Sequence, residues 1–184
     1  MGLLRYTVIA SVDGYVEDRT GSFDWAEPDE EVHAFANEQE RSIGTELYGR
    51  RMWETMRWWG TDEATTDQSP VVEEFAAAWR AVDKVVFSAS LEPPDAPRTR
   101  LERTFEPAAV RALKESSDRD LSVGGAALAA TALKAGLVDE IGLILVPVSV
   151  GGGKPALPDA MLRLDLLEER RFAGGTVYLR YAVR

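Results

Sequence analysis

The sequence predicts an α/β protein with a central mixed, mostly parallel sheet, helices on both faces and an antiparallel hairpin at the C-terminus. Three observations predict this three-layer architecture. Strand-like and helix-like patterns alternate along the chain, the strand-like segments are short apolar runs, and Gly174-Gly175 joins the last two as a hairpin turn. Because 184 residues suffice for about one hydrophobic core, we expect a single domain over residues 1–184.

In the first half of the chain, three strand-like runs alternate with helical patterns. The runs are rich in β-branched, aromatic or other apolar residues and span residues 3–10, 45–49 and 84–88. The helices are expected to begin at capping, glycine or proline signals, namely after Asp29, after Gly49 and at Ser69-Pro70. A strand therefore meets a helix directly at Gly49, with the helix running over residues 50–58.

The second half continues the alternation and ends in the hairpin. Residues 91–98 contain three prolines and are expected to form a loop, and Gly151–Gly153 is expected to be a flexible loop. The predicted helices begin at Glu106-Pro107 and span residues 126–135, with Gly136 after the C-cap. The predicted strands span residues 121–123, 141–148, 166–172 and 176–183.

Composition excludes several classes of function. The net charge is −10, and residues 1–80 hold 17 acidic against 7 basic residues, which disfavours nucleic-acid binding. There is no cysteine, no apolar run long enough to span a bilayer and no signal-peptide pattern, so we expect a cytoplasmic protein without a membrane partner. The single histidine, His33, has no partner at metal-binding spacing, so we expect a surface histidine and no metal site.

A strand runs directly into paired glycines and then a helix in the segment DLSVGGAAL, residues 120–128. Small residues let a backbone approach a ligand closely, and a helix start offers unpaired N–H groups and a positive dipole end. This arrangement suits a pyrophosphate. From the residues alone a second interpretation stays open, in which Gly124 and Gly125 only permit a tight turn and close packing.

A second junction of this kind is LYGRRMW, residues 47–53, where Gly49 ends a strand. Arg50-Arg51 is the only adjacent basic pair among the first 80 residues. The planar guanidinium of arginine matches phosphate oxygens, so an arginine beside a helix start can recognise a ribose 2′-phosphate. The alternative is an ordinary surface arginine paired with a neighbouring acid.

Acidic residues supply the candidates for proton transfer. Glu27–Glu31 (EPDEE) is typical of a solvated helix start, but a carboxylate beside a reducible ring could relay a proton, and we expect Glu30 or Glu31, not both, to point inward. Asp13 follows the first strand, where ligands gather in open α/β sheets. Lys154 follows three glycines without Walker spacing, which favours a mobile loop.

Five motifs occur in a characteristic order over nearly the whole chain. They are ASVDGYV (10–16), LYGRRMWE (47–54), KVVFSASL (84–91), DLSVGGAALAATALKAGLVDEI (120–141) and LVPVSVGGGKP (145–155). Together they resemble the dihydrofolate-reductase-like superfamily, and more closely the C-terminal reductase domain of bacterial riboflavin-biosynthesis deaminase-reductases and their stand-alone relatives. The zinc-binding His/Cys cluster of the deaminase half has no counterpart here, so the bifunctional enzyme is not expected.

The resemblance implies a dihydrofolate-reductase-like fold and an oxidoreductase that transfers hydride from NADPH to a bound small molecule. It implies that Ala10 and Val16 frame the nicotinamide. The other cofactor positions that it implies are Gly49, Arg50, Arg51 and Met52 at the adenosine phosphates, Ser88 on the adenosine side, and Gly124, Gly125, Ala126 and Leu128 at the pyrophosphate.

The substrate is expected to be a small heterocycle or ribosylamine, as for 5-amino-6-(5-phosphoribosylamino)uracil reductase. By resemblance Ser11 and Asp13 line the substrate side, Trp25 and Glu30 lie where dihydrofolate reductases have an aromatic residue and an acid, and Asp13 or Glu30 handles a proton. Residues 11–31 are rich in acids and lack the basic residues that would bind a ribose phosphate, so this region differs from a substrate site that holds a phosphate group. The alternatives are dihydrofolate reductase activity and a non-catalytic NADPH-binding dimeric module. Apolar C-terminal strands and five tryptophans predict a homodimer.

Overall fold

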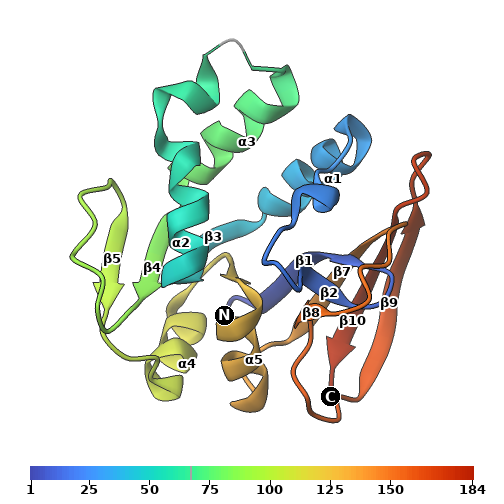
Figure 1. The fold of residues 1–184 in the computed structure, drawn as a ribbon. Coiled ribbons are helices and arrows are strands. Elements are labelled where there is room, and N and C mark those ends of the chain that lie inside the picture. Colours follow the sequence, from blue (N-terminus) through green and yellow to red (C-terminus); the bar gives the residue numbers. More distant parts are fainter. Residues whose placement is uncertain (67) are drawn as a thin grey trace.

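A computed structural model describes residues 1–66 and 68–184 and shows one large sheet between two layers of helices (Figure 1). The strands are β1 (Leu4–Ser11), β2 (Tyr15–Asp18), β3 (Ile43–Gly49), β4 (Asp83–Phe87), β5 (Thr99–Glu102), β6 (Asp120–Gly124), β7 (Glu140–Val146), β8 (Gly153–Pro155), β9 (Leu164–Arg171) and β10 (Val177–Val183). The helices are α1 (Glu30–Glu40), α2 (Arg50–Met56), α3 (Pro70–Ala81), α4 (Pro107–Ser116) and α5 (Ala126–Lys134), with 3₁₀ turns η1 (Asp24–Ala26), η2 (Arg57–Gly60) and η3 (Asp62–Thr65).

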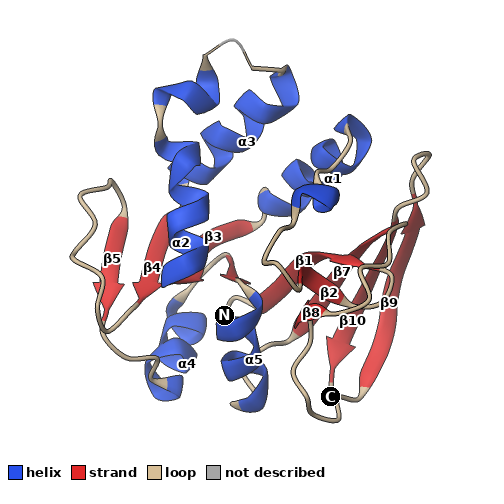
Figure 2. Cartoon of the chain, viewed as in Figure 1, coloured by secondary structure: helices blue, strands red, loops and turns tan. Residues whose placement is uncertain are grey.

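The large sheet has eight strands in the order β5-β4-β3-β6-β1-β7-β10-β9. The pairs from β5 to β7 are parallel, whereas β10 runs antiparallel to both β7 and β9. Figure 2 shows α4 and α5 on one side of this sheet and α1, α2 and α3 on the other. The predicted fold class is thereby confirmed, including the antiparallel hairpin at the C-terminus.

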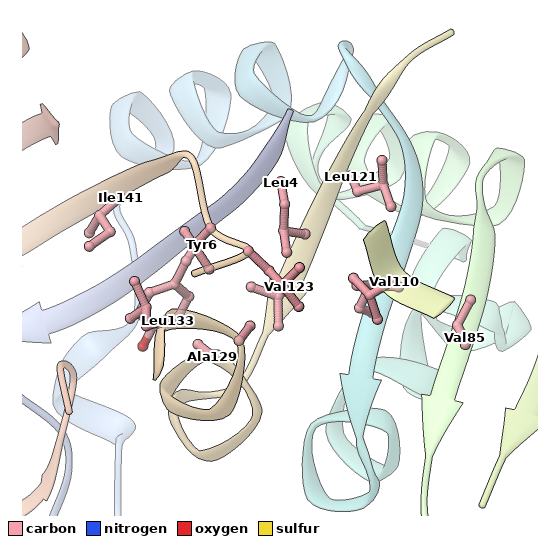
Figure 3. Packing of buried hydrophobic residues seen from close by; sticks show 13 residues of the cluster. Leu4, Tyr6, Val85, Val110, Leu121, Val123, Ala129, Leu133 and Ile141 are labelled. Carbon is pink, nitrogen blue, oxygen red and sulfur yellow. The ribbon is translucent and has the colours of Figure 1, made fainter. Parts of the chain in front are cut away.

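Alternating side chains of the strands build a separate core on each side of the sheet. On the α4–α5 side, Leu4, Leu121 and Val123 are fully buried in one hydrophobic cluster with Ala129 and Ala132 of α5, and Figure 3 shows part of this cluster. Small residues let α5 lie close to the strands, as parallel sheets covered by helices require. On the other side, one cluster forms under α1 and a second, rich in aromatic rings, under α2 and α3.

Three short strands differ from the prediction. β5 lies in a charged segment at the sheet edge, and β2 pairs only with β8 in a separate two-stranded sheet. Gly151–Gly153 is therefore not wholly a loop, because Gly153 begins β8. A Cβ atom at Gly153 would overlap the carbonyl group of Glu17, so the close approach of β2 and β8 requires glycine there.

A ladder of alternating charges crosses five adjacent strands on the α1 side. Arg5 on β1 contacts Asp120 at 2.7 Å and Glu140 at 3.4 Å, and Arg180 on β10 contacts Glu140 at 3.2 Å and Glu168 at 3.1 Å. Glu140 lies at the centre of this row of ion pairs, and its side chain is 13% exposed. Each guanidinium lies between two carboxylates, so the ladder fixes the lateral alignment of β6, β1, β7, β10 and β9.

Replacing Glu140 by glutamine is expected to lower the free energy of unfolding by about 1–2 kcal/mol, because two partly buried arginines each lose an anionic partner. Urea unfolding followed by circular dichroism measures the change. Glu102→Gln is the matched control, since its contact with Arg100 is half exposed and should change stability by less than about 0.5 kcal/mol. Equal losses of unfolding free energy in the two variants would show that Glu140 contributes no more than an exposed surface carboxylate.

In the part of the chain that the structure describes, no helix is both long and apolar enough to cross a membrane.

Candidate functional site

The two glycine junctions singled out in the sequence lie next to each other at the carboxyl ends of β3 and β6. Tyr48 on β3 is paired with Gly124 on β6, and α2 and α5 begin immediately after these strands. A Cβ atom at Gly49 would lie 3.8 Å from Cβ of Leu128, and one at Gly125 would lie 3.2 Å from Cβ of Met52. Residues 49–52 and 124–128 therefore form one continuous surface, as binding of a single dinucleotide across both junctions requires.

Both interpretations of the paired glycines apply. The ring of Tyr48 packs directly beneath Gly124, where a Cβ atom would lie only 2.6 Å from Cε1 of Tyr48, so close packing requires glycine at this position. Gly125, the N-cap of α5, has φ +90° and offers no side chain to the helix start. The first-turn amides of α5 are thus capped by no side chain, and they and the helix dipole are available to an anion.

Basic and hydroxyl side chains gather beside α2. Nε of Arg50 lies 2.8 Å from Oε1 of Glu54, and its Nη1 lies 3.4 Å from Oγ of Ser90. Arg51 is exposed and forms no ion pair among the described residues. The alternative of a surface arginine paired with an acid thus applies to Arg50, and Arg51 is the guanidinium left for a phosphate.

The loop after β4 is held from both sides. Ser88 is 9% exposed, and its Oγ accepts a hydrogen bond from the amide of Leu91 at 3.0 Å. Nη1 of Arg103 donates to the carbonyl oxygen of Leu91 at 2.7 Å. Sequence reasoning missed Arg103, because it lies in a charged segment without a motif and only the fold brings it to this loop.

A cavity of about 200 Å³ lies beside the first half of α5 and is lined by Ala126, Ala127, Ala130, Lys154, Pro155, Leu157 and Pro158. Lys154 is on β8, and its Nζ lies 3.1 Å from Oε1 of Glu17 on β2. The prediction of a mobile loop at Lys154 is therefore wrong. The pairing of β2 with β8 brings this lysine to the edge of the glycine-lined surface.

Asp13 connects two loops at the carboxyl end of β1. Its carboxylate accepts hydrogen bonds from the amides of Gly151 at 2.7 Å and Val150 at 3.1 Å. The Ser11 hydroxyl, followed by these amides, holds the pKa of the Asp13 carboxyl well below its usual range. Asp13 is therefore a weak base and a poor proton donor near neutral pH, and its position favours an anchoring role over the expected proton transfer.

The structure places the other expected nicotinamide and substrate residues around β1, η1 and α1. Ala10 and Ser11 are fully buried at the end of β1, and Val16 is partly buried on β2. The indole N–H of Trp25 in η1 donates to the carbonyl oxygen of Ser22 at 3.2 Å, which orients the ring. Trp25 lies on a separate element, and no contact joins it to the glycine junctions among the hydrogen bonds and ring pairs described.

The acidic start of α1 differs from the prediction, because Glu30 and Glu31 are both exposed and neither points inward. Oε2 of Glu31 accepts a hydrogen bond from the amide of Ala173 at 2.9 Å, which attaches α1 to the β9–β10 hairpin. Asp29 is the N-cap, and its carboxylate accepts from the amide of Val32 at 2.9 Å. The helix dipole and solvent therefore account for most of this acidic run.

His33 is partly exposed, so the expected surface position holds only in part. Its ring centroid lies 6.0 Å from that of Trp59 and 5.7 Å from that of Phe75, and burial lowers the pKa of the imidazole. The reason is that η2 and α3 pack against α1, a contact that periodicity alone did not indicate. Among the residues that the structure describes, no group of three or more His, Asp or Glu side chains is arranged to hold a metal ion.

The fold is an α/β domain with two adjacent strand–helix junctions at the carboxyl edge of its sheet, where such sheets hold their ligands, and comparisons with known proteins specify the family. The family model described as the RibD C-terminal domain matches residues 3–178. The chain belongs to this family of reductase domains, which places it among the oxidoreductases.

One relative and two solved structures are similar to this chain over most of its length. The chain is 30% identical over 176 residues to the uncharacterized protein YyaP of Bacillus subtilis (strain 168), covering 93% of this chain and 89% of that protein. Its fold is similar to a putative riboflavin biosynthesis protein from Shewanella sp. PV-4, with a TM-score of 0.74, 16% identity and 99% of each chain covered. It also matches RibD of Acinetobacter baumannii, with a TM-score of 0.74 and 15% identity, covering 100% of this chain and 58% of that one.

Proposed function

We propose that the protein is an NADPH-dependent reductase that transfers hydride to a small heterocyclic or ribosylamine substrate. The observation that carries the proposal is the contact between the glycine junction of β6–α5 and the arginine junction of β3–α2. Two phosphate-binding devices lie side by side on one surface, within a fold whose family consists of reductase domains. When bound, NADPH supplies the hydride, and the protein supplies binding, orientation and electrostatics.

The residues present fit this cofactor. At Gly125 no side chain covers the start of α5, so the first-turn amides of this helix could donate to the oxygens of a pyrophosphate. Arg51 would bind the 2′-phosphate, with Arg50 and the hydroxyls of Ser88 and Ser90 beside it. Gly49, Met52, Ala126 and Leu128 complete the surface at the two helix starts, and Ala10 and Val16 would flank the nicotinamide.

The substrate side supports a ligand without a tightly held phosphate. The basic residue within 11–31 is Arg19, and its Nη2 donates to the carbonyl oxygen of Gly151 at 2.9 Å. Ser11 and Trp25 would contact the substrate in this proposal. Of the two carboxylates expected to handle a proton, Glu30 remains the candidate, because its side chain is exposed and hydrogen bonds hold the pKa of Asp13 well below its usual range.

Calorimetric titration of the purified protein with NADPH tests the proposal directly, and saturable binding is expected. No saturable binding at millimolar cofactor would overturn it. Oxidation of NADPH, followed at its absorbance band, then distinguishes the reactions when a pyrimidine ribosylamine or dihydrofolate is added. Saturable binding without oxidation over this panel would favour a non-catalytic binding module.

Arg51→Ala is expected to weaken NADPH binding about tenfold or more and to leave NADH binding nearly unchanged, because one charge-assisted contact to the 2′-phosphate is lost. Arg50→Ala should have the smaller effect, since its guanidinium already contacts Glu54. Arg111→Ala on α4 is the control for a simple change in net charge. Equal losses of affinity for NADPH and NADH would show that Arg51 does not contact the 2′-phosphate.

A further inference from the structure

Tyr48 is a buried side chain that lies directly against the backbone of Gly124. A Cβ atom at Gly124 would lie 2.6 Å from Cε1 and 2.7 Å from Cδ1 of Tyr48, so the ring touches the glycine backbone and leaves no room for a side chain between them. Gly124 immediately precedes Gly125, the N-cap of α5. The position of the Tyr48 ring therefore sets the position of the turn whose amides would hold the pyrophosphate.

Trp79 on α3 holds the hydroxyl end of this tyrosine. The indole Nε1 of Trp79 donates a hydrogen bond to the Tyr48 hydroxyl at 3.0 Å, and the two residues are 7% and 2% exposed. At this depth the bond satisfies both polar groups, and its loss would leave one of them buried without a partner. Packing against Gly124 fixes one edge of the tyrosine ring, and a directional bond fixes its hydroxyl.

Trp79 also contacts the helix of the arginine junction. Its ring stacks on that of Trp53, with the ring centroids 6.1 Å apart and an interplanar angle of 25°. Trp53 lies on α2, three residues after Arg50, and is 4% exposed. One tryptophan therefore supports both strand–helix junctions, the glycine junction through Tyr48 and the arginine junction through Trp53.

A buried cation holds Trp79 in turn. Nζ of Lys84 on β4 lies 4.0 Å from the ring centroid of Trp79, and Lys84 is 1% exposed. A cation over the face of an indole is attracted by the ring electrons, more strongly when both are removed from water. Polar contacts in a core are directional and costly to leave unpaired, so they specify one arrangement of the rings where apolar packing would permit several.

We propose that Tyr48 and Trp79 are positioning residues for the dinucleotide, which set the separation and orientation of the two junctions and touch no ligand themselves. Both are buried in one cluster, on the side of the sheet that carries α2 and α3 (Figure 2). The inference rests on the proposed function. It adds that affinity for the cofactor depends on a hydrogen bond inside the core, whose loss moves the amides of α5 without removing any group from the binding surface.

Tyr48→Phe and Trp79→Phe test the inference, because each removes the internal hydrogen bond and keeps an aromatic ring. Each is expected to raise the NADPH dissociation constant, measured by calorimetric titration, by about fivefold. The double variant should bind little more weakly than the weaker of the two single variants, since both substitutions break the same bond. Affinity for NADH should fall by the same factor, because both cofactors contain the pyrophosphate, whereas Arg51→Ala is expected to affect NADPH alone.

Hydrogen–deuterium exchange without cofactor supplies a second readout, followed by mass spectrometry on the segment 120–128. The amides at the start of α5 are expected to exchange faster in Tyr48→Phe and in Trp79→Phe than in wild type, because the turn before the helix has lost its fixed support. This measurement reports the displaced turn directly and does not depend on a bound dinucleotide.

Phe172→Leu is the control for a general loss of stability. Phe172 is 1% exposed in the separate cluster under α1, and it follows β9, which β10, β7, β1 and β6 separate from β3. This variant should lower the urea midpoint of unfolding and leave NADPH affinity and exchange in the segment 120–128 unchanged. Wild-type affinity in both single variants, additive losses in the double variant, or an equal loss of affinity in Phe172→Leu would each overturn the inference and leave the proposed function standing. A wild type that does not bind NADPH would overturn both.

Discussion

Gly125→Ala is expected to weaken NADPH binding by about tenfold or more and to lower the free energy of unfolding by about 1–3 kcal/mol. At φ +90° and ψ 125°, residues with a side chain are strained, so the turn between β6 and α5 would shift. The new Cβ atom would also lie 3.2 Å from Cβ of Met52, on the surface shared by the two junctions. Both effects displace the amides of α5 that would hold the pyrophosphate.

Gly136→Ala is the matched control, because Gly136 lies just beyond the other end of α5. Its φ is +63°, and no atom lies within 4 Å of the position that a Cβ would occupy. This variant should lose stability through backbone strain alone and bind NADPH as tightly as wild type. Calorimetric titration and urea unfolding of both variants separate the two effects. Equal affinities in Gly125→Ala and Gly136→Ala would remove Gly125 from the cofactor site.

The sequence predicted those features that depend on local patterns. The apolar runs predicted the long strands, and the capping residue Asp29 and the paired glycines Gly124-Gly125 predicted the helix starts within a residue or two. The adjacency of the two junctions was predictable because the carboxyl ends of parallel strands meet at one edge of a sheet. Only the structure, however, shows that Tyr48 is paired with Gly124 and that β6 therefore lies next to β3.

Features that depend on distant partners could not be predicted. β2 and β8 are three or four residues long and exist because they pair with each other across more than 130 residues of chain. The partial burial of His33 was not predicted, because helical periodicity does not report that the rings of Trp59 and Phe75 lie against it. Asp13 was one of two candidates for proton transfer, and the sequence did not indicate that its carboxylate accepts hydrogen bonds from the distant amides of Val150 and Gly151.

A pair of interior carboxyl groups was also invisible in the sequence. Glu46 on β3 is 3% exposed, and its neighbour Glu40, near the end of α1, is partly buried. Burial raises the pKa of Glu40 well above its ordinary value, and the charge of Glu46 raises it further. Burial also raises the pKa of Glu46, although Ser122 and Lys84 offset part of this effect. Both carboxyl groups therefore have a pKa above that of a solvated glutamate, and neighbouring charge adds to the effect of burial at Glu40.

Glu40→Gln is expected to stabilise the protein at pH 8, by on the order of 1 kcal/mol, and to flatten the dependence of its stability on pH. A carboxyl whose pKa is raised on folding contributes stability fully below the unfolded pKa, near 4.5, and this stability is lost as the pH rises through the folded pKa. Glutamine has no proton to lose, and its amide can still donate a hydrogen bond to Glu46.

Urea unfolding of wild type and variant at pH 5, 6, 7 and 8 measures the difference. Two other groups titrate in or near this pH range and affect wild type and variant alike. The quantity to compare is therefore the difference in free energy of unfolding between the two proteins at each pH, not the pH dependence of either protein alone. The pKa of His33 is lowered, so its titration makes the protein more stable as the pH rises toward 6.5. Burial lowers the pKa of Lys84 to about 8, so its titration makes the protein more stable as the pH rises above 8. Glu38→Gln, on an exposed position of α1, is the control and should follow wild type at every pH. If Glu40→Gln also follows wild type, the pair is ionised in the folded protein, and Lys84, which is 1% exposed, must then balance its charge.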